Sequence, residues 1–194
     1  MRELVIATSN PGKIKDFEKI LGSQYFSYLS LKDISFFDEI VEDGDSFQEN
    51  ALIKARAVYN YTHKATLADD SGICVDALHG APGIFSARFA GKHGDNEANN
   101  LKLASLLEKE ENRKAHYFCA LAFINEKGEE FVFNGKIEGH IVLPPRGTGG
   151  FGYDPYFQPE GLQTTFAEME ILEKKNISHR GQAIHAFQEF IHGQ

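Results

Sequence analysis

This chain of 194 residues has no long apolar run, no excess of basic residues and only two cysteines. No apolar run could span a bilayer and the N-terminus lacks a signal-peptide pattern, so we expect neither a membrane partner nor secretion. Lys and Arg total 20 against 28 Asp and Glu, a formal charge of −8. This balance argues against a nucleic-acid polymer as partner. It leaves room for a small phosphate ligand, which needs only local positive charge.

The scarcity of cysteine limits the covalent and metal chemistry of the chain. Cys74 and Cys119 lie in apolar, strand-like runs, which favours buried free thiols in a reducing cytoplasm, although two cysteines could in principle pair. His179 and His185 lack zinc-site spacing with either cysteine, so no structural zinc is expected. The 42% of hydrophobic residues exclude general disorder and predict one domain with a sizeable core.

Apolar periodicity and turn residues predict alternating strands and helices. Strands are expected at residues 3–7, 25–31, 65–68, 73–78, 115–125 and 130–143, and helices at residues 11–21, 47–62, 96–110 and 181–191. The elements both alternate and cluster, which indicates an α/β fold with a mixed sheet.

The segment that joins the first strand to the first helix is the most informative. It reads Thr8-Ser9-Asn10-Pro11-Gly12-Lys13. Asn10 can cap the helix and Pro11 suits its first turn, so free backbone N–H groups and the Lys13 charge would meet where a phosphate could bind. The Walker spacing is absent. The alternative is an ordinary strand–loop–helix corner with a surface lysine.

Two acidic segments are candidates for hydrolytic chemistry. In residues 69–72, Asp69 and Asp70 precede Ser71 and Gly72. Two adjacent carboxylates could bind a divalent cation, or one could act as a base for water. The same residues are also typical of a turn, and taken alone this segment favours a turn. Glu42 lies in a second acidic run, residues 39–45, which could equally be a solvated loop. Ordinary pKa values near 4 predict that all these carboxylates are ionised at neutral pH.

Two later segments could face a planar base. Residues 147–152 contain four glycines around Phe151, and such a loop usually persists because a backbone or a ligand approaches closely. A flexible hairpin connection with one anchoring aromatic is the alternative. Lys174, His179 and Arg180 near the start of the last helix could donate to a base or a phosphate, whereas Ser178 could be there simply to cap that helix.

Taken together and in order, these motifs closely resemble the inosine triphosphate pyrophosphatase family, which includes dITP/XTP pyrophosphatases. The resemblance runs from Thr8 to about Ala183 and rests on residues 8–13, 47–55, 68–72, 80–88, 147–155 and 178–181. Ser9 is a small departure, because many members have glycine there.

The resemblance implies an elongated, two-lobed α/β fold around a long mixed sheet with flanking helices. Residues 1–194 would form a single nucleotide pyrophosphatase domain with a central substrate cleft. It would be a cytoplasmic homodimer, and Mg²⁺-dependent hydrolysis would convert ITP, dITP or XTP to the monophosphate and pyrophosphate. Alternatives are a pyrophosphatase for other modified nucleotides or pyrimidines, a non-catalytic nucleotide-binding protein, and a structural protein.

The resemblance also implies roles for particular residues. Asp70 would be catalytic, and Glu42 and Asp70 would hold the metal. The substrate-binding residues would be Thr8, Ser9, Asn10, Pro11, Gly12, Lys13 and Lys54 at the phosphates, Ser71, and Phe151, Gly152, Tyr153, Asp154, Lys174, His179 and Arg180 at the base and sugar. Donors such as Arg180 facing a C6 carbonyl would leave adenine unpaired and so reject it.

Overall fold

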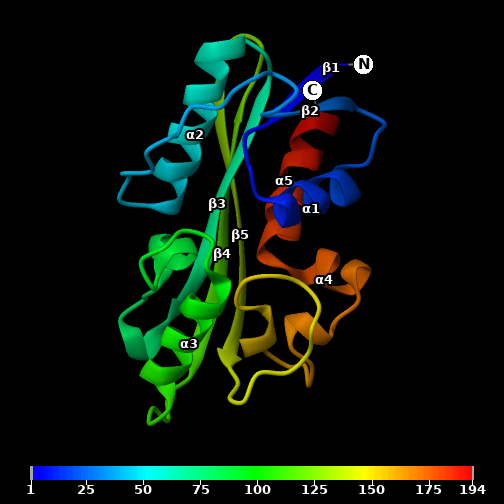
Figure 1. Ribbon diagram of the computed structural model, residues 1–194. Coiled ribbons are helices and arrows are strands. Elements are labelled where there is room, and N and C mark those ends of the chain that lie inside the picture. The colour runs from blue at the N-terminus through cyan, green and yellow to red at the C-terminus, as the bar shows by residue number, and fades with distance from the viewer. Residues whose placement is uncertain (1, 194) are drawn as a thin grey trace. The chain divides into compact units, whose positions relative to one another are not determined.

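Six strands form one mixed sheet in the order β2-β1-β3-β4-β5-β6 in a computed structural model that describes residues 2–193 (Figure 1). Their bounds are β1 Arg2–Ile6, β2 Phe26–Ser30, β3 Thr66–Val75, β4 Lys114–Ile124, β5 Glu130–Ile141 and β6 Phe157–Pro159. β1 pairs in parallel with β2 and with β3, whereas β5 and β6 are antiparallel. The mixed α/β sheet expected from the sequence is therefore confirmed.

Within residues 2–193 five α-helices accompany the sheet, and local sequence signals account for most of their ends. They are α1 Pro11–Leu21, α2 Phe47–Thr62, α3 Asn96–Leu107, α4 Ile171–Ile177 and α5 His179–His192. The Asn10 side chain caps α1 as predicted, and Gly22 ends that helix with a positive φ of 68°. α4 was not predicted. It ends where the Ser178 backbone N–H donates to the carbonyl of Lys174, so Ser178 lies between α4 and α5.

The chain divides into two compact units. Within the described residues, the first comprises 2–70, 119–135 and 180–193. In this unit α2 lies on one side of the sheet, and α1 and α5 lie on the other (Figure 1). Its core is built from apolar side chains of β1, α1, β4 and α5, including Leu4, Phe17, Leu121 and Phe187.

The second unit comprises residues 71–118 and 136–179. Its core includes Ile73, Leu103, Tyr117, Phe157 and Phe166. α3 lies on one side of the strands of this unit, and the glycine-rich segment with α4 lies on the other (Figure 1).

Residues 69–72, taken alone, predicted a turn. This prediction is wrong, because β3 is one continuous strand from Thr66 to Val75. β1 pairs with β3 only at Val5↔Thr66 and Ile6↔Leu67, so Asp69 and Asp70 lie on the part of β3 that extends past the end of β1. Asp69 is 1% and Asp70 6% exposed. Buried carboxylates need partners, and this strand persists because other elements supply them.

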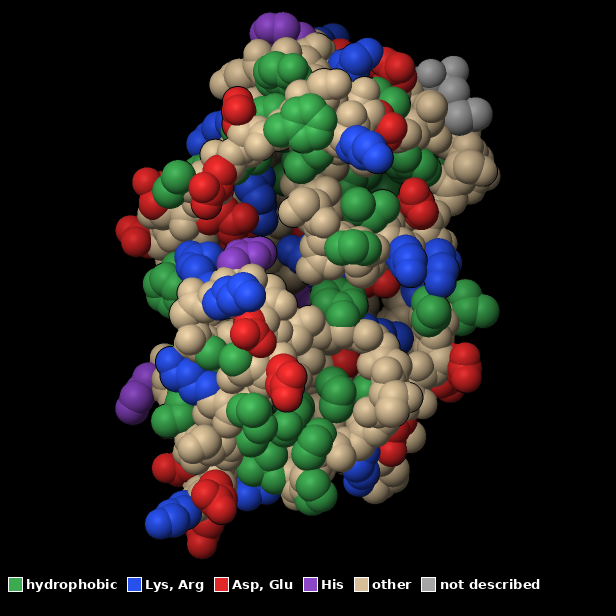
Figure 2. Space-filling model, in the orientation of Figure 1, with side chains coloured by type: hydrophobic (Ala, Val, Ile, Leu, Met, Phe, Trp, Pro, Cys, Tyr) green, Lys and Arg blue, Asp and Glu red, His purple; other side chains and the backbone are tan. Residues whose placement is uncertain are grey.

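The surface charges and the two thiols can be compared with what the composition predicts. Figure 2 shows acidic and basic side chains interspersed over the described part of the face in view, without a continuous basic area. No helix within residues 2–193 is both long and apolar enough to cross a membrane. Cys74 and Cys119 are free thiols; Cys119 is buried as predicted, whereas Cys74 is only half-buried.

Candidate functional site

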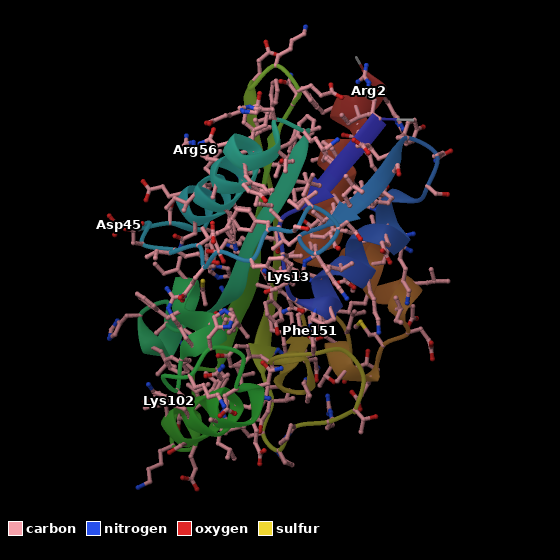
Figure 3. The ribbon with its side chains drawn as sticks, turned by 45° about the horizontal axis from the view of Figure 1, so that its top comes forward. Arg2, Lys13, Asp45, Arg56, Lys102 and Phe151 are labelled. Atoms are coloured by element: carbon pink, nitrogen blue, oxygen red, sulfur yellow. The ribbon has the colours of Figure 1, made fainter. Side chains whose placement is uncertain are left out.

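A cluster of ion pairs in the first unit brings together several of the charged residues that the sequence singled out. We call it the carboxylate cluster, and its members are Lys13, Asp16, Glu42, Lys54, Asp69, Asp70 and Arg180. Asp69 Oδ2 lies 3.1 Å from Lys13 Nζ and 3.5 Å from Arg180 Nε. Lys13 comes from the start of α1, where Figure 3 labels it, and Arg180 comes from the start of α5.

The two cations of α1 and α5 keep the Asp69 carboxylate charged. Burial alone would raise the pKa of Asp69, but Lys13, Arg180 and Lys54 together hold it well below its ordinary value. Arg180 is itself only 3% exposed, and its Nη1 lies 2.7 Å from Asp16 Oδ2. The guanidinium is therefore committed to two carboxylates of the first unit.

Asp70 has its partner on the opposite face of the sheet. Successive side chains of a strand point to opposite faces, and Asp70 Oδ1 lies 3.8 Å from Nζ of Lys54, a residue of α2. The same ammonium lies 3.1 Å from Glu42 Oε1. Lys54 thus joins the two carboxylates assigned to the metal, whereas Asp69 is held by α1 and α5.

The environment of Asp70 changes its acidity. Burial is the largest effect and raises the pKa of Asp70, to about 6. Lys54 and Lys13 act to lower this pKa, whereas the negative charges of Glu42 and Asp69 act to raise it. The expectation of an ordinary pKa near 4 is therefore wrong for this residue. A carboxyl with a pKa near neutrality is suited to accept a proton.

The donor set around Asp70 fits a magnesium ion bound together with substrate. The described residues contain no group of three or more His, Cys, Asp or Glu side chains that could hold a metal alone. Mg²⁺, however, commonly binds one or two carboxylates and completes its shell with substrate phosphates and water. Asp70 Oδ2 is buried and accepts no hydrogen bond from any residue of the described chain, and Glu42 is the second carboxylate.

The loop before α1 binds most of its own amides, so fewer N–H groups are free than expected. Asn10 Oδ1 accepts from Gly12 N at 2.9 Å and from Lys13 N at 3.4 Å. Thr8 Oγ1 accepts from Asn10 N at 3.1 Å, and Thr8 N donates to the Ile6 carbonyl. Pro11 has no N–H to donate. The side chain of Lys13 is therefore a stronger phosphate donor in this conformation than the loop backbone.

A second cluster, in the second unit, gathers the residues assigned to the base. We call it the ring cluster, and it consists of Tyr117, Phe151, Asp154, Phe166, Lys174 and His179. Lys174 Nζ lies 2.6 Å from Asp154 Oδ2 and 5.1 Å from the centre of the Phe151 ring. The structure places Arg180 in the carboxylate cluster, so the base assignments Lys174 and His179 belong to a different unit from Arg180.

Other predicted residues have supporting contacts in the same unit. The Tyr153 hydroxyl donates to the carbonyl of Ser86 at 2.6 Å, and the Gly152 carbonyl accepts from Asn100 Nδ2 at 3.1 Å. Tyr153 is 5% exposed, so its side chain supports the 80–88 loop. Ser71 is half-buried on β3.

Sequence reasoning gave no role to four residues of these clusters, Asp16, Asp69, Tyr117 and Phe166. Asp16 lies three positions after Lys13 on α1, a helical spacing that could have shown that the two share a face. Asp69 was considered only as the neighbour of Asp70. Tyr117 gave no signal, because an aromatic residue in a strand is ordinary core.

The raised pKa of Asp70 predicts a pH-dependent stability. The unfolded chain ionises this group at its ordinary value of 3.8 but the folded chain only near 6, so its stabilising contribution is complete below about pH 4 and is lost as the pH rises through about 6. We expect Asp70→Asn to gain stability over the wild type, by about 1–3 kcal/mol more near pH 8 than near pH 4. Denaturant unfolding of both proteins in chelator measures this; equal differences at both pH values would contradict it.

The second unit also contains a cavity of about 790 Å³ that includes no predicted site residue. It is lined by the start of β4, the end of β5 and the segment that follows, and its charged residues, such as Glu138 and Arg146, have both signs. Nothing in its lining favours one kind of ligand.

Comparison with known proteins gives consistent matches over almost the whole chain. Residues 4–190 match the Ham1 family. Proteins named dITP/XTP pyrophosphatase from Geobacter sulfurreducens and Bacillus subtilis are each 46% identical to this chain, over 186 and 187 residues, covering 95% of it and 94% of each relative. The Staphylococcus aureus Ham1 structure has a TM-score of 0.89 at 38% identity and covers 99% of both chains. A Mycobacterium abscessus nucleoside-triphosphatase / dITP/XTP pyrophosphatase has a TM-score of 0.78 at 42% identity, covering 95% of this chain and 98% of that one.

Proposed function

The chain belongs to the Ham1 family, as its motifs predicted, and we infer that it is a dITP/XTP pyrophosphatase. The observation in the structure that supports this most is Lys54, which joins Asp70 and Glu42 at 3.8 and 3.1 Å. Asp70 is the buried one of these two carboxylates, and burial raises its pKa toward neutrality. We propose that this carboxyl serves hydrolysis at the α-phosphorus, releasing pyrophosphate.

The cations of the carboxylate cluster are proposed to bind the triphosphate. Lys13 and Lys54 are each held by a buried carboxylate, and their side chains remain 14% and 12% exposed. An ammonium fixed in advance stabilises charge that develops on the leaving pyrophosphate without reorganising during the reaction. Asp69 would therefore act by positioning Lys13.

Asp70 is proposed to take the proton of the attacking water or to position the metal, with Glu42 as the other metal ligand. Bound Mg²⁺ would supply charge neutralisation at the phosphates. The raised pKa of Asp70 makes its carboxylate a better proton acceptor near neutral pH than an ordinary aspartate. Its Oδ2 accepts no hydrogen bond from the described residues, so the carboxylate has an unused acceptor for either task.

The ring cluster is proposed to select the base. Hypoxanthine and xanthine present a C6 carbonyl acceptor and an N1–H donor, whereas adenine presents an amino donor and a bare ring nitrogen. The Lys174 ammonium has three donor hydrogens and donates one of them to Asp154. Its remaining hydrogens can meet the C6 carbonyl, while adenine would leave them unpaired, and the Phe151 ring offers a stacking face.

Turnover of four nucleotides with and without Mg²⁺ tests this function. We expect pyrophosphate release from dITP and XTP far faster than from dATP or dTTP, and loss of activity in excess chelator. A preference for dTTP would support the pyrimidine alternative. Binding without turnover of any of the four would support the non-catalytic one, and full activity in chelator would contradict the metal assignment.

Lys13→Ala is expected to lower kcat/KM for dITP by about 10- to 100-fold, the scale of a hydrogen bond to a charged group. If Lys13 contacts the phosphates more strongly in the transition state, where their charge develops, then Lys13→Ala should lower kcat and also raise KM. Lys15→Ala is the matched control, because Lys15 is exposed on the same helix. A raised KM with unchanged kcat would restrict Lys13 to substrate binding, and no effect would make residues 8–13 an ordinary loop.

A homodimer is proposed from the family resemblance alone. Sedimentation equilibrium should give twice the mass of the 21.7 kDa chain. A monomer mass at assay concentrations would contradict it.

A further inference from the structure

The Tyr117 hydroxyl reaches a buried carboxylate of the ring cluster. Tyr117 lies on β4, and its hydroxyl donates to Asp154 Oδ1 at 3.2 Å. Tyr117 is 6% and Asp154 4% exposed. Tyr117 is therefore too deeply buried to read a substrate directly, and its effect must pass through its neighbours.

The Asp154 carboxylate gathers three donors at one point. Besides Tyr117, it accepts from Lys174 Nζ at 2.6 Å and from the Phe151 backbone N–H at 3.0 Å, both on Oδ2. A Cβ on Gly150 would lie 2.1 Å from that oxygen, so glycine is required where the loop passes over the carboxylate. Asp154 thereby fixes both the lysine and the Phe151 backbone (Figure 3 labels Phe151).

The Tyr117 ring supports the same residues from a second direction. It stacks on the His179 ring at 4.5 Å with an interplanar angle of 7°, and on the Phe166 ring at 5.6 Å and 12°. Lys174 Nζ lies 5.3 Å from the Phe166 ring centre. One buried tyrosine thus connects Asp154, Lys174 and His179.

We propose that Tyr117 is a positioning residue for base selection, acting through Asp154 to aim the Lys174 ammonium at the C6 position of the purine. This rests on the proposed function of the ring cluster. The hydroxyl restrains Oδ1 of Asp154, and without it the carboxylate can rotate and carry Lys174 with it. Selection for a C6 carbonyl over an amino group depends on that direction, because hydrogen bonds weaken steeply as their angle departs from linear.

Tyr117→Phe separates the hydroxyl from the ring, since it keeps the stacking on His179 and Phe166. We expect the ratio of kcat/KM for dITP to that for dATP to fall about tenfold, the lower end of a hydrogen bond to a charged group. Tyr156→Phe is the control, because Tyr156 is another buried tyrosine of the same core and is not a member of the ring cluster. In Tyr156→Phe the ratio of kcat/KM for dITP to that for dATP should equal that of the wild type.

A double variant shows whether the effect passes through the lysine. In Lys174→Met the ratio should already be low, and adding Tyr117→Phe should lower it no further, because two residues acting through one contact are not additive. An unchanged ratio in Tyr117→Phe, or a further loss in the double variant, would overturn the role of Tyr117 while leaving the proposed function intact. A wild type with no preference for dITP would overturn both.

Discussion

Asp70→Asn is expected to lower the turnover of dITP by at least about 100-fold, the scale of a lost general base. Asparagine keeps the size of the side chain but cannot accept the proton, and it removes a charge from the proposed metal site. The fold should persist, because asparagine avoids burying a charge at a site that raises the pKa of Asp70 to about 6. Steady-state kinetics with saturating Mg²⁺, beside a melting curve, measures both effects.

An aspartate outside the cluster provides the control for this variant. Asp76 follows β3 directly and is exposed at the start of a short 3-10 helix, so Asp76→Asn should keep wild-type turnover. Near-normal turnover in Asp70→Asn would remove Asp70 from the mechanism. A large loss in both variants would point to a general effect of charge removal instead.

The largest expected loss of stability is in Arg180→Ala. This change leaves Asp69 buried with fewer cations, because Arg180 Nη1 and Nε lie 2.7 Å from Asp16 and 3.5 Å from Asp69. Removing one partner of a buried pair costs about 3–5 kcal/mol. For a chain of this size the Tm should fall by roughly 6–20 °C, measurable by calorimetry in chelator.

Arg56→Ala is the matched control for the buried arginine. Arg56 makes two bonds of 2.7 Å to Glu130, better geometry than that of Arg180, but its side chain is 51% exposed. Exposed pairs contribute about 0–1 kcal/mol, so its Tm should hardly change. Equal losses in the two variants would contradict the burial argument. The ratio of kcat/KM for dITP to that for dATP should be the same in Arg180→Ala as in the wild type. A smaller ratio in this variant would show that Arg180 contributes to recognition of the base.

The sequence predicts those parts of the fold whose causes are local. α1 is an example, because Asn10, Pro11 and Gly22 fix its ends within one segment. The strands β4 and β5 were likewise predicted, at residues 115–125 and 130–143, from their apolar residues and the turn residues between them. The family could be predicted because six short motifs occur in one order, although each motif alone has an ordinary structural alternative.

Features set by distant partners could not be predicted in this way. Asp69 and Asp70 have the local chemistry of a turn, but Lys13, Lys54 and Arg180 come from three helices to stabilise them within a strand. The pKa of Asp70 depends on the same burial. Tyr117 acquires its proposed role only because Asp154, far along the chain, lies against its hydroxyl.

The position of the water attack tests the central claim most directly. Hydrolysis of dITP in water enriched in heavy oxygen, with Mg²⁺ present, labels whichever phosphorus is attacked. Attack at the α-phosphorus, as proposed for the water served by Asp70, predicts label in the deoxyinosine monophosphate and none in the pyrophosphate. Label in the pyrophosphate, or release of labelled orthophosphate with the diphosphate, would contradict this account.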